Sequence, residues 1–205
     1  MVQPVSPSQP PALPQPDSAP TRVSGPTGRR FCRLSLEATP ANGTWPVPPD
    51  GLCLSSFLLL SPAGRSKEVL VGKLDPRAPW AEIGALDPRR VTLNASGWML
   101  PSCHLLYFES PETAARRVAS EQLGIDRVEL EAPRIFSEAY RPARHPERGE
   151  HWDIEFLYRG VAPAHWRPRH SAWVELKFLD PSATARAEFT RSHDQVLELA
   201  GFAIG

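Results

Sequence analysis

The stretch Cys103–Ile125, CHLLYFESPETAARRVASEQLGI, carries the strongest local signal in the chain. Ser110 is a favourable N-cap residue, and Pro111 suits the first helical position because its φ is preset and it has no backbone N–H to satisfy. Gly124 stands where a left-handed residue is needed to end a helix. Together these signals predict a helix from Pro111 to about Leu123.

The same stretch resembles the Nudix box, the signature of a superfamily of hydrolases. The family pattern is Gly, five residues, Glu, seven residues, and then Arg-Glu-apolar-x-Glu-Glu-x-Gly-apolar. The residues in register with it are Glu109, Arg117, Ala119, Glu121, Gly124 and Ile125. Three fixed positions differ, with Cys103 for the first Gly, Val118 for the Glu after the Arg, and Gln122 for the last Glu. The resemblance therefore keeps the spacing of the box and changes part of its chemistry.

In Nudix enzymes, carboxylates at the positions of Val118, Glu121 and Gln122 hold Mg²⁺ or Mn²⁺ against a pyrophosphate that water attacks. These positions, at i, i+3 and i+4, share one stripe of a helix. Mg²⁺ requires oxygen ligands, so Val118 offers none, Gln122 offers a neutral carbonyl oxygen, and Glu121 is the remaining carboxylate. The resemblance also implies a backbone carbonyl ligand near the start of the box, at Cys103. We therefore expect Glu121 to be the catalytic residue, and Glu121, Gln122 and Cys103 to form a weak metal site or none.

Other residues of the box have structural roles in the family. The resemblance implies that Glu109 and Arg117 form an ion pair that ties the loop to the helix, and that Gly124 ends the helix. Many Nudix proteins also place a base or a further metal ligand in a loop after the box helix. Glu147 and Glu150 are our candidates for that position.

The composition argues against several classes of protein. Lys plus Arg and Asp plus Glu are both 23, so a net charge of zero gives no general attraction for nucleic-acid polymers. The cysteines, Cys32, Cys53 and Cys103, form no Cys-x-x-Cys pair and leave one unmatched, which argues against a disulfide framework. No apolar run is long enough to span a membrane, and the N-terminus lacks a signal-peptide pattern. These features indicate a cytoplasmic protein.

The chain divides into three parts by composition. Residues 1–28 are rich in Pro, Ser and Gln and bury too little surface to offset their ordering entropy, so we expect a disordered tail. Residues 29–49 are a lead-in segment, and residues 50–202 are expected to form a Nudix-like domain. Within the domain, the apolar runs Cys53–Leu60 and Val69–Leu74 are expected to pair with each other as a hairpin.

The segment 75–96 between these strands and the box contains Pro76, Pro79 and Pro88. Prolines interrupt regular structure, so we expect this segment to be long and irregular. Its arginines are candidates for phosphate contact: Arg77, Arg89 and Arg90.

Beyond the box, apolar patterns predict strands near 134–138, 151–159 and 172–176, followed by a C-terminal helix. The alternation within 151–159 indicates a strand with one buried face. Ser192, with Gln195 three residues on, matches a capping box at the start of the last helix. This order of elements matches the α/β fold class, as a Nudix-type α/β/α sandwich with a mixed sheet.

Two functions fit these observations best. The first is binding of a nucleoside-diphosphate-type or other phosphate-bearing small molecule, with weak or lost pyrophosphohydrolase activity. The second is active, metal-dependent pyrophosphohydrolysis that uses Glu121 plus a loop carboxylate, Glu147 or Glu150. A third reading is a structural or interaction subunit. The sequence leaves open which substrate is used and whether the chain forms a homodimer.

Overall fold

The structure, a computed structural model, describes residues 33–34, 52–140, 151–166 and 172–205. The predicted disordered tail and the loop carrying Glu147 and Glu150 lie outside the described residues, as does nearly all of the lead-in segment. The strands are β1 (Arg33–Leu34), β2 (Leu52–Ser61), β3 (Val69–Leu74), β4 (Ser102–His104), β5 (Arg134–Tyr140), β6 (His151–Val161) and β7 (Trp173–Leu179). The helices are α1 (Trp80–Ile83), α2 (Pro88–Asn94), α3 (Pro111–Leu123) and α4 (His193–Leu199), with short 3₁₀ turns at Pro181–Ala183 and Arg186–Glu188.

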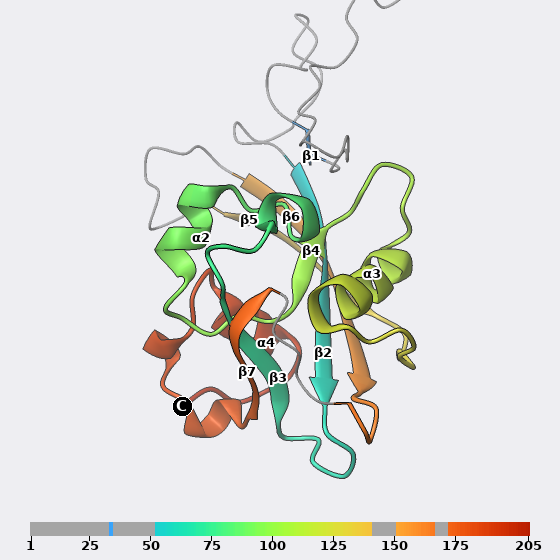
Figure 1. Ribbon diagram of the computed structural model, residues 1–205, viewed down its shortest axis with the longest axis vertical. Coiled ribbons are helices and arrows are strands. Elements are labelled where there is room, and N and C mark those ends of the chain that lie inside the picture. The colour runs from blue at the N-terminus through green and yellow to red at the C-terminus, as the bar shows by residue number, and fades with distance from the viewer. Residues whose placement is uncertain (1–32, 35–51, 141–150, 167–171) are drawn as a thin grey trace, which may run out of the picture.

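The main sheet is mixed and is built around β2. This strand runs parallel to β6 and antiparallel to β1 and β4, while β5 pairs antiparallel with the far side of β6. The order β1-β2-β6-β5 therefore leaves β5 at one edge of the sheet. The mixed sheet that the sequence predicted is confirmed (Figure 1).

Side chains of β2 alternate between two apolar cores, one on each face of the sheet. Leu58 and Leu60 pack in the core that contains the buried side of α3, whereas Phe57 and Leu59 pack with α4. Successive side chains of a strand point to opposite faces, so one strand can supply both cores. The predicted α/β/α sandwich is confirmed, with α3 beside β2 in the view of Figure 1.

The predicted hairpin of β2 and β3 is wrong. Instead, β3 pairs antiparallel with β7 in a separate two-stranded sheet, although it follows β2 closely in the chain. Val69, Leu70 and Val71 are all fully buried, so β3 needs apolar cover on both faces. It obtains that cover by packing between the two cores, because alternate β3 residues belong to each of them.

The segment 75–96 is more regular than predicted. Pro79 stands directly before α1, and Pro88 is the first residue of α2. The Asp87 side chain caps α2 by accepting a hydrogen bond from the Arg90 backbone N–H at 2.9 Å. Proline is well suited to the first helical turn, where its missing donor costs nothing, so here it starts helices instead of preventing them.

Two further expectations fail where tertiary packing overrides the local pattern. The strand β6 does not have a single buried face, because Leu157 lies in the α4 core and Tyr158 in the α3 core. The capping box predicted for the last helix is absent, since Ser192 has a left-handed φ of 59° and its side chain makes no cap hydrogen bond. Among the described residues, no helix combines the length and apolar character that crossing a membrane requires.

Candidate functional site

The box helix α3 begins and ends at the predicted residues. The Ser110 hydroxyl accepts a hydrogen bond from the Thr113 backbone N–H at 3.1 Å, and Pro111 opens the helix. Gly124 adopts a left-handed φ of 66°, and its N–H donates to the carbonyl of Ser120 at 3.1 Å. The helix is thus fixed by its own sequence at both ends.

Glu109 and Arg117 join the box loop to this helix. The Arg117 Nε and Nη2 atoms donate to the two carboxylate oxygens of Glu109, both at 2.8 Å. Arg117 Nη2 also donates to the backbone carbonyl of His104 at 3.1 Å. The two side chains are only 10% and 7% exposed, so this pair is both buried and bidentate. Such a pair holds the loop in one position on the helix.

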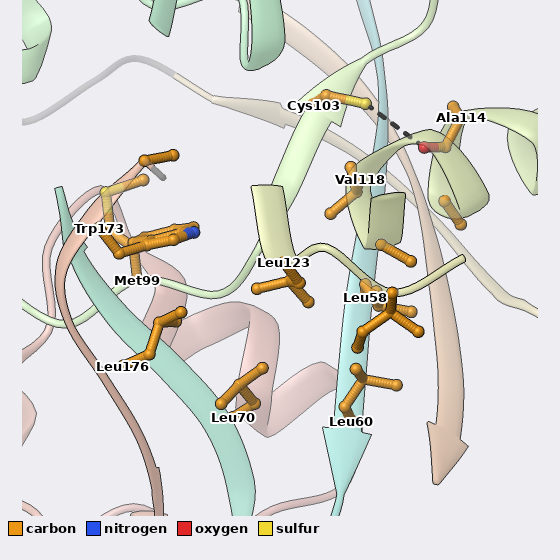
Figure 2. Packing of buried hydrophobic residues seen from close by; sticks show 14 of the residues in the cluster. Leu58, Leu60, Leu70, Met99, Cys103, Ala114, Val118, Leu123, Trp173 and Leu176 are labelled. Carbon is orange, nitrogen blue, oxygen red and sulfur yellow. Dashed lines mark hydrogen bonds between the residues drawn. The ribbon is translucent and has the colours of Figure 1, made fainter. Parts of the chain in front are cut away.

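Val118 lies in the apolar core and not at a polar site. It is 1% exposed, and the cluster that surrounds it includes Leu58, Leu123 and Met99 (Figure 2). An apolar side chain at this position extends the core that joins α3 to the sheet. Position 118 therefore provides no side-chain oxygen ligand.

Gln122 is fully buried, and its side-chain amide presents N–H groups, not the oxygen, to the backbone just before the box. Its amide Nε2 donates to the backbone carbonyls of Ser102 at 2.8 Å and Ile83 at 2.9 Å. The other amide atom, Oε1, is buried and has no hydrogen-bond partner. With two carbonyls as its neighbours, the amide must place N–H there, which is the opposite of the oxygen ligand that we expected from the sequence.

Glu121 and Cys103 complete the set of residues expected to hold a metal ion. Glu121 is 27% exposed, and one carboxylate oxygen lies 4.0 Å from Nη1 of Arg117. Burial raises the pKa of the Cys103 thiol to about 12, so the sulfur is neutral, and Arg117 Nη2 lies 3.3 Å from it. Within the described part of the chain, no three acidic, histidine or cysteine side chains come together as a metal site. Of the three helix positions expected to supply carboxylates, only Glu121 therefore offers one to Mg²⁺ or Mn²⁺.

Two indole groups fix the other end of α3. Trp173 Nε1 donates to the carbonyl of Gln122 at 3.1 Å, and Trp166 Nε1 donates to the carbonyl of Leu123 at 2.9 Å. The last carbonyls of a helix have no partner within it, so these indoles satisfy groups that would otherwise be left unpaired.

No family model and no curated protein matches the sequence. Solved structures do match it, among them the MutT NUDIX hydrolase from Burkholderia pseudomallei, with 18% identity and a TM-score of 0.48, over 72% of this chain and 97% of that one. The E. coli dihydroneopterin triphosphate pyrophosphohydrolase has 18% identity and a TM-score of 0.48, over 71% of this chain and 92% of that one. The NUDIX domain of Shewanella oneidensis NrtR, complexed with ADP ribose, has 16% identity and a TM-score of 0.47, over 80% of this chain and 93% of that one.

The box loop, its capped helix and the two-sided mixed sheet occur here in the order that the Nudix resemblance implied. The chain is therefore an α/β/α sandwich whose order of elements agrees with the Nudix resemblance. The box has the loop-to-helix pair and the helix caps that the resemblance implied, while Val118 and Gln122 lie in the protein interior.

The three candidate arginines lie in different settings. Arg77 is 87% exposed and pairs with Asp75, with Nη2 at 3.0 Å from the carboxylate. Arg90 Nε lies 3.4 Å from the carboxylate of Asp87, its own helix cap. Arg89 is exposed on the same helix. The neighbouring aspartates reduce the positive charge that Arg77 and Arg90 present, so Arg89 is the stronger phosphate candidate of the three.

Sequence reasoning missed a polar row on the α4 face of the main sheet. His104, Ser55 and Glu155 lie side by side on β4, β2 and β6, and Ser55 Oγ is 2.9 Å from His104 Nδ1. Burial, and after it the nearby charges of Asp153 and Glu138, raises the pKa of the Glu155 carboxyl to about 7. Its Oε2 is buried without a hydrogen-bond partner. A serine pair inside the apolar run of β2 was the only signal of this row in the sequence.

Proposed function

We propose that this Nudix-type protein binds a phosphate-bearing small molecule, of the nucleoside-diphosphate type, without efficient hydrolysis. The observation that carries the proposal is the buried amide of Gln122. Its N–H groups donate to the carbonyls of Ser102 and Ile83. A carboxylate at this position has no proton to donate, so it would need a cation between itself and those carbonyl oxygens. Val118 supports the same conclusion, because its side chain fills the core.

The loss expected from these two changes is large. Removing a single preorganised electrostatic group from an active site typically costs about 2.7–4 kcal/mol in transition-state stabilisation. Such losses are not additive when the groups act together on one site. With Glu121 as the sole carboxylate of the three positions, metal-assisted attack of water on a pyrophosphate lacks most of its support.

The ligand class follows from the resemblance of the box, whose relatives hold a pyrophosphate next to α3. A ligand such as ADP-ribose, with which the Shewanella oneidensis domain was crystallised, is a suitable first probe. Arg89 and the exposed edge of Glu121 are the groups that we expect near its phosphates and any accompanying cation.

One observation favours active hydrolysis as the second candidate. Glu121 keeps 27% of its side chain exposed, so a cation could reach it from solvent. In that reading Glu147 or Glu150, outside the described residues, would supply a further carboxylate. The two candidates differ in turnover and not in ligand.

The test combines binding and turnover on the full chain. Calorimetry with ADP-ribose and with nucleoside diphosphates should show binding, and phosphate release with Mg²⁺ or Mn²⁺ should stay far below the usual enzymatic range of about 1–10³ per second. Turnover within that range, abolished by Glu121→Gln and unchanged in the exposed control Glu129→Gln, would establish the hydrolase instead. Absence of binding to every phosphate-bearing probe would refute both candidates.

A further inference from the structure

The outer edge of β5 is a free sheet edge within the part of the chain that the structure describes. The sheet order ends at β5, and none of the isolated bridges involves it. The strand is seven residues long, from Arg134 to Tyr140. A row of backbone N–H and C=O groups along such an edge can pair with another strand.

Two of the usual protections of a sheet edge, a bulge and a proline, are missing from β5, although the strand carries the charged residues Arg134 and Glu138. Its register with β6 continues from Arg134 to Tyr140 without a shift, so no bulge turns the edge away. No proline lies within the strand, and Ile135 is 60% exposed. An unbulged edge of this length with an exposed apolar side chain favours pairing with a partner strand.

The charges on β5 are arranged so that the strand is complementary to itself. Arg134, Phe136 and Glu138 alternate onto the α4 face, because their partners in register include Leu157, which lies in the α4 core. Glu138 stands near one end of this row, and its partner in register on β6 is Asp153. The basic residue stands at the other end of the same face.

We propose that two copies of the chain pair through β5, antiparallel and centred on Phe136. In this register Arg134 of each copy stands opposite Glu138 of the other, and the two Phe136 side chains face each other. Directly opposite residues on antiparallel strands have Cβ atoms about 4.5–5.5 Å apart, close enough for two ion pairs and an aromatic contact. A two-fold axis through the edge makes the interface closed, so the assembly stops at a dimer.

A groove beside the edge offers room for the incoming side chains. Its volume is about 480 Å³, and it is lined by Phe136, Ser137, Glu138, Gln195, Glu198 and Leu199. The groove thus has an apolar floor and carboxylates along its wall, which suits the long aliphatic stem and guanidinium of Arg134 from the second copy.

The test measures the mass of the full chain by sedimentation from about 1 µM to about 100 µM, a range that spans ordinary dimer affinities. The wild type should shift from monomer to dimer within it. Arg134→Glu and Glu138→Arg should each raise the dimer Kd at least about tenfold, because two attractive pairs become repulsive. The double variant with both changes should dimerise as the wild type does.

Controls separate the interface from folding. Arg134 Nη1 also donates to the carbonyl of Leu199 at 3.3 Å, so Arg134→Glu could disturb α4, whereas Glu138→Arg leaves that contact intact. Arg127→Glu, an equal charge change at an exposed position outside β5, should leave the Kd unchanged. A wild type that stays monomeric over the whole range overturns the proposal. A dimer whose Kd is unchanged by Arg134→Glu and Glu138→Arg overturns it as well.

Discussion

Two pairs of residues of the box lie in different surroundings. Glu109 and Arg117 form the buried ion pair that the Nudix pattern implies, with two bonds of 2.8 Å. Val118 and Gln122, one and five positions further along, stand where the pattern has carboxylates and have become a core residue and a buried amide clamp. The ion pair holds the box loop on the helix, and the shape of the box therefore does not require carboxylates at positions 118 and 122.

The largest effect that tests this comparison is expected from Arg117→Ala. The change leaves the carboxylate of Glu109, only 7% exposed, without its cation, so the free energy of unfolding should fall by about 3–5 kcal/mol. Urea denaturation measures it. The matched control is Arg116→Ala, which removes a half-exposed ion pair with Glu112 and one hydrogen bond to the Val128 carbonyl and should cost about 1–2 kcal/mol. Equal losses in both variants would mean that the box loop is not held by its ion pair.

Gln122→Glu tests the second half of the comparison. A carboxylate facing the carbonyls of Ser102 and Ile83 removes two hydrogen bonds and adds repulsion, so stability should fall by about 1–3 kcal/mol without metal. A cation that binds only the folded variant restores stability by mass action. Millimolar Mg²⁺ should therefore raise the melting temperature of the variant and not that of the wild type. If the two respond alike, position 122 does not face a metal site.

Glu155 provides a contrast to Glu109, as a buried carboxyl whose Oε2 lacks a partner. Its folded pKa of about 7 exceeds the ordinary value of 4.5, so the folded protein holds a proton that the unfolded chain releases. This stabilisation is complete below about pH 4.5 and is lost as the pH rises through 7.

Glu155→Gln cannot ionise and should keep its stability as the pH rises. Relative to the wild type, its free energy of unfolding should gain about 2–3 kcal/mol between pH 5 and pH 8. Chemical denaturation at the two pH values checks this. A difference between the two proteins that stays constant with pH would show that Glu155 ionises normally.

The smallest effect concerns the caps. Ser110→Ala removes the hydroxyl that accepts from the Thr113 N–H and should cost about 1 kcal/mol. Ser192→Ala is the matched control, because that hydroxyl makes no cap hydrogen bond and its removal should cost almost nothing. Thermal denaturation of both variants distinguishes the two helices. A greater loss at Ser192 would contradict the assignment of the caps.

The sequence predicted α3 to the residue because its start and end depend on local contacts, those of Ser110 and Gly124. The partner of β3 was not predictable in the same way. Whether β3 pairs with β2 or β7 depends on burial of both its faces, which is a property of the assembled core. Pro88 was misread because proline is favoured at the first turn of a helix as strongly as it is excluded from the interior.

The candidate site shows the same division. The spacing identified the box positions, and the loop-to-helix pair lies where the resemblance implied it. The orientation of the Gln122 amide could not be read from the sequence, because two backbone carbonyls from distant segments determine it. Glu155 escaped notice because its neighbours Asp153 and Glu138 come together only when β5 and β6 pair.

The indoles of Trp173 and Trp166, which donate to the last carbonyls of α3, give the protein a built-in optical reporter. Indole emission depends on the polarity and hydrogen bonding around the ring. Any ligand or cation that shifts the end of the box helix should change it. Titrations can therefore be followed by intrinsic fluorescence, with no label attached. Phenylalanine at either position would show which ring carries the signal.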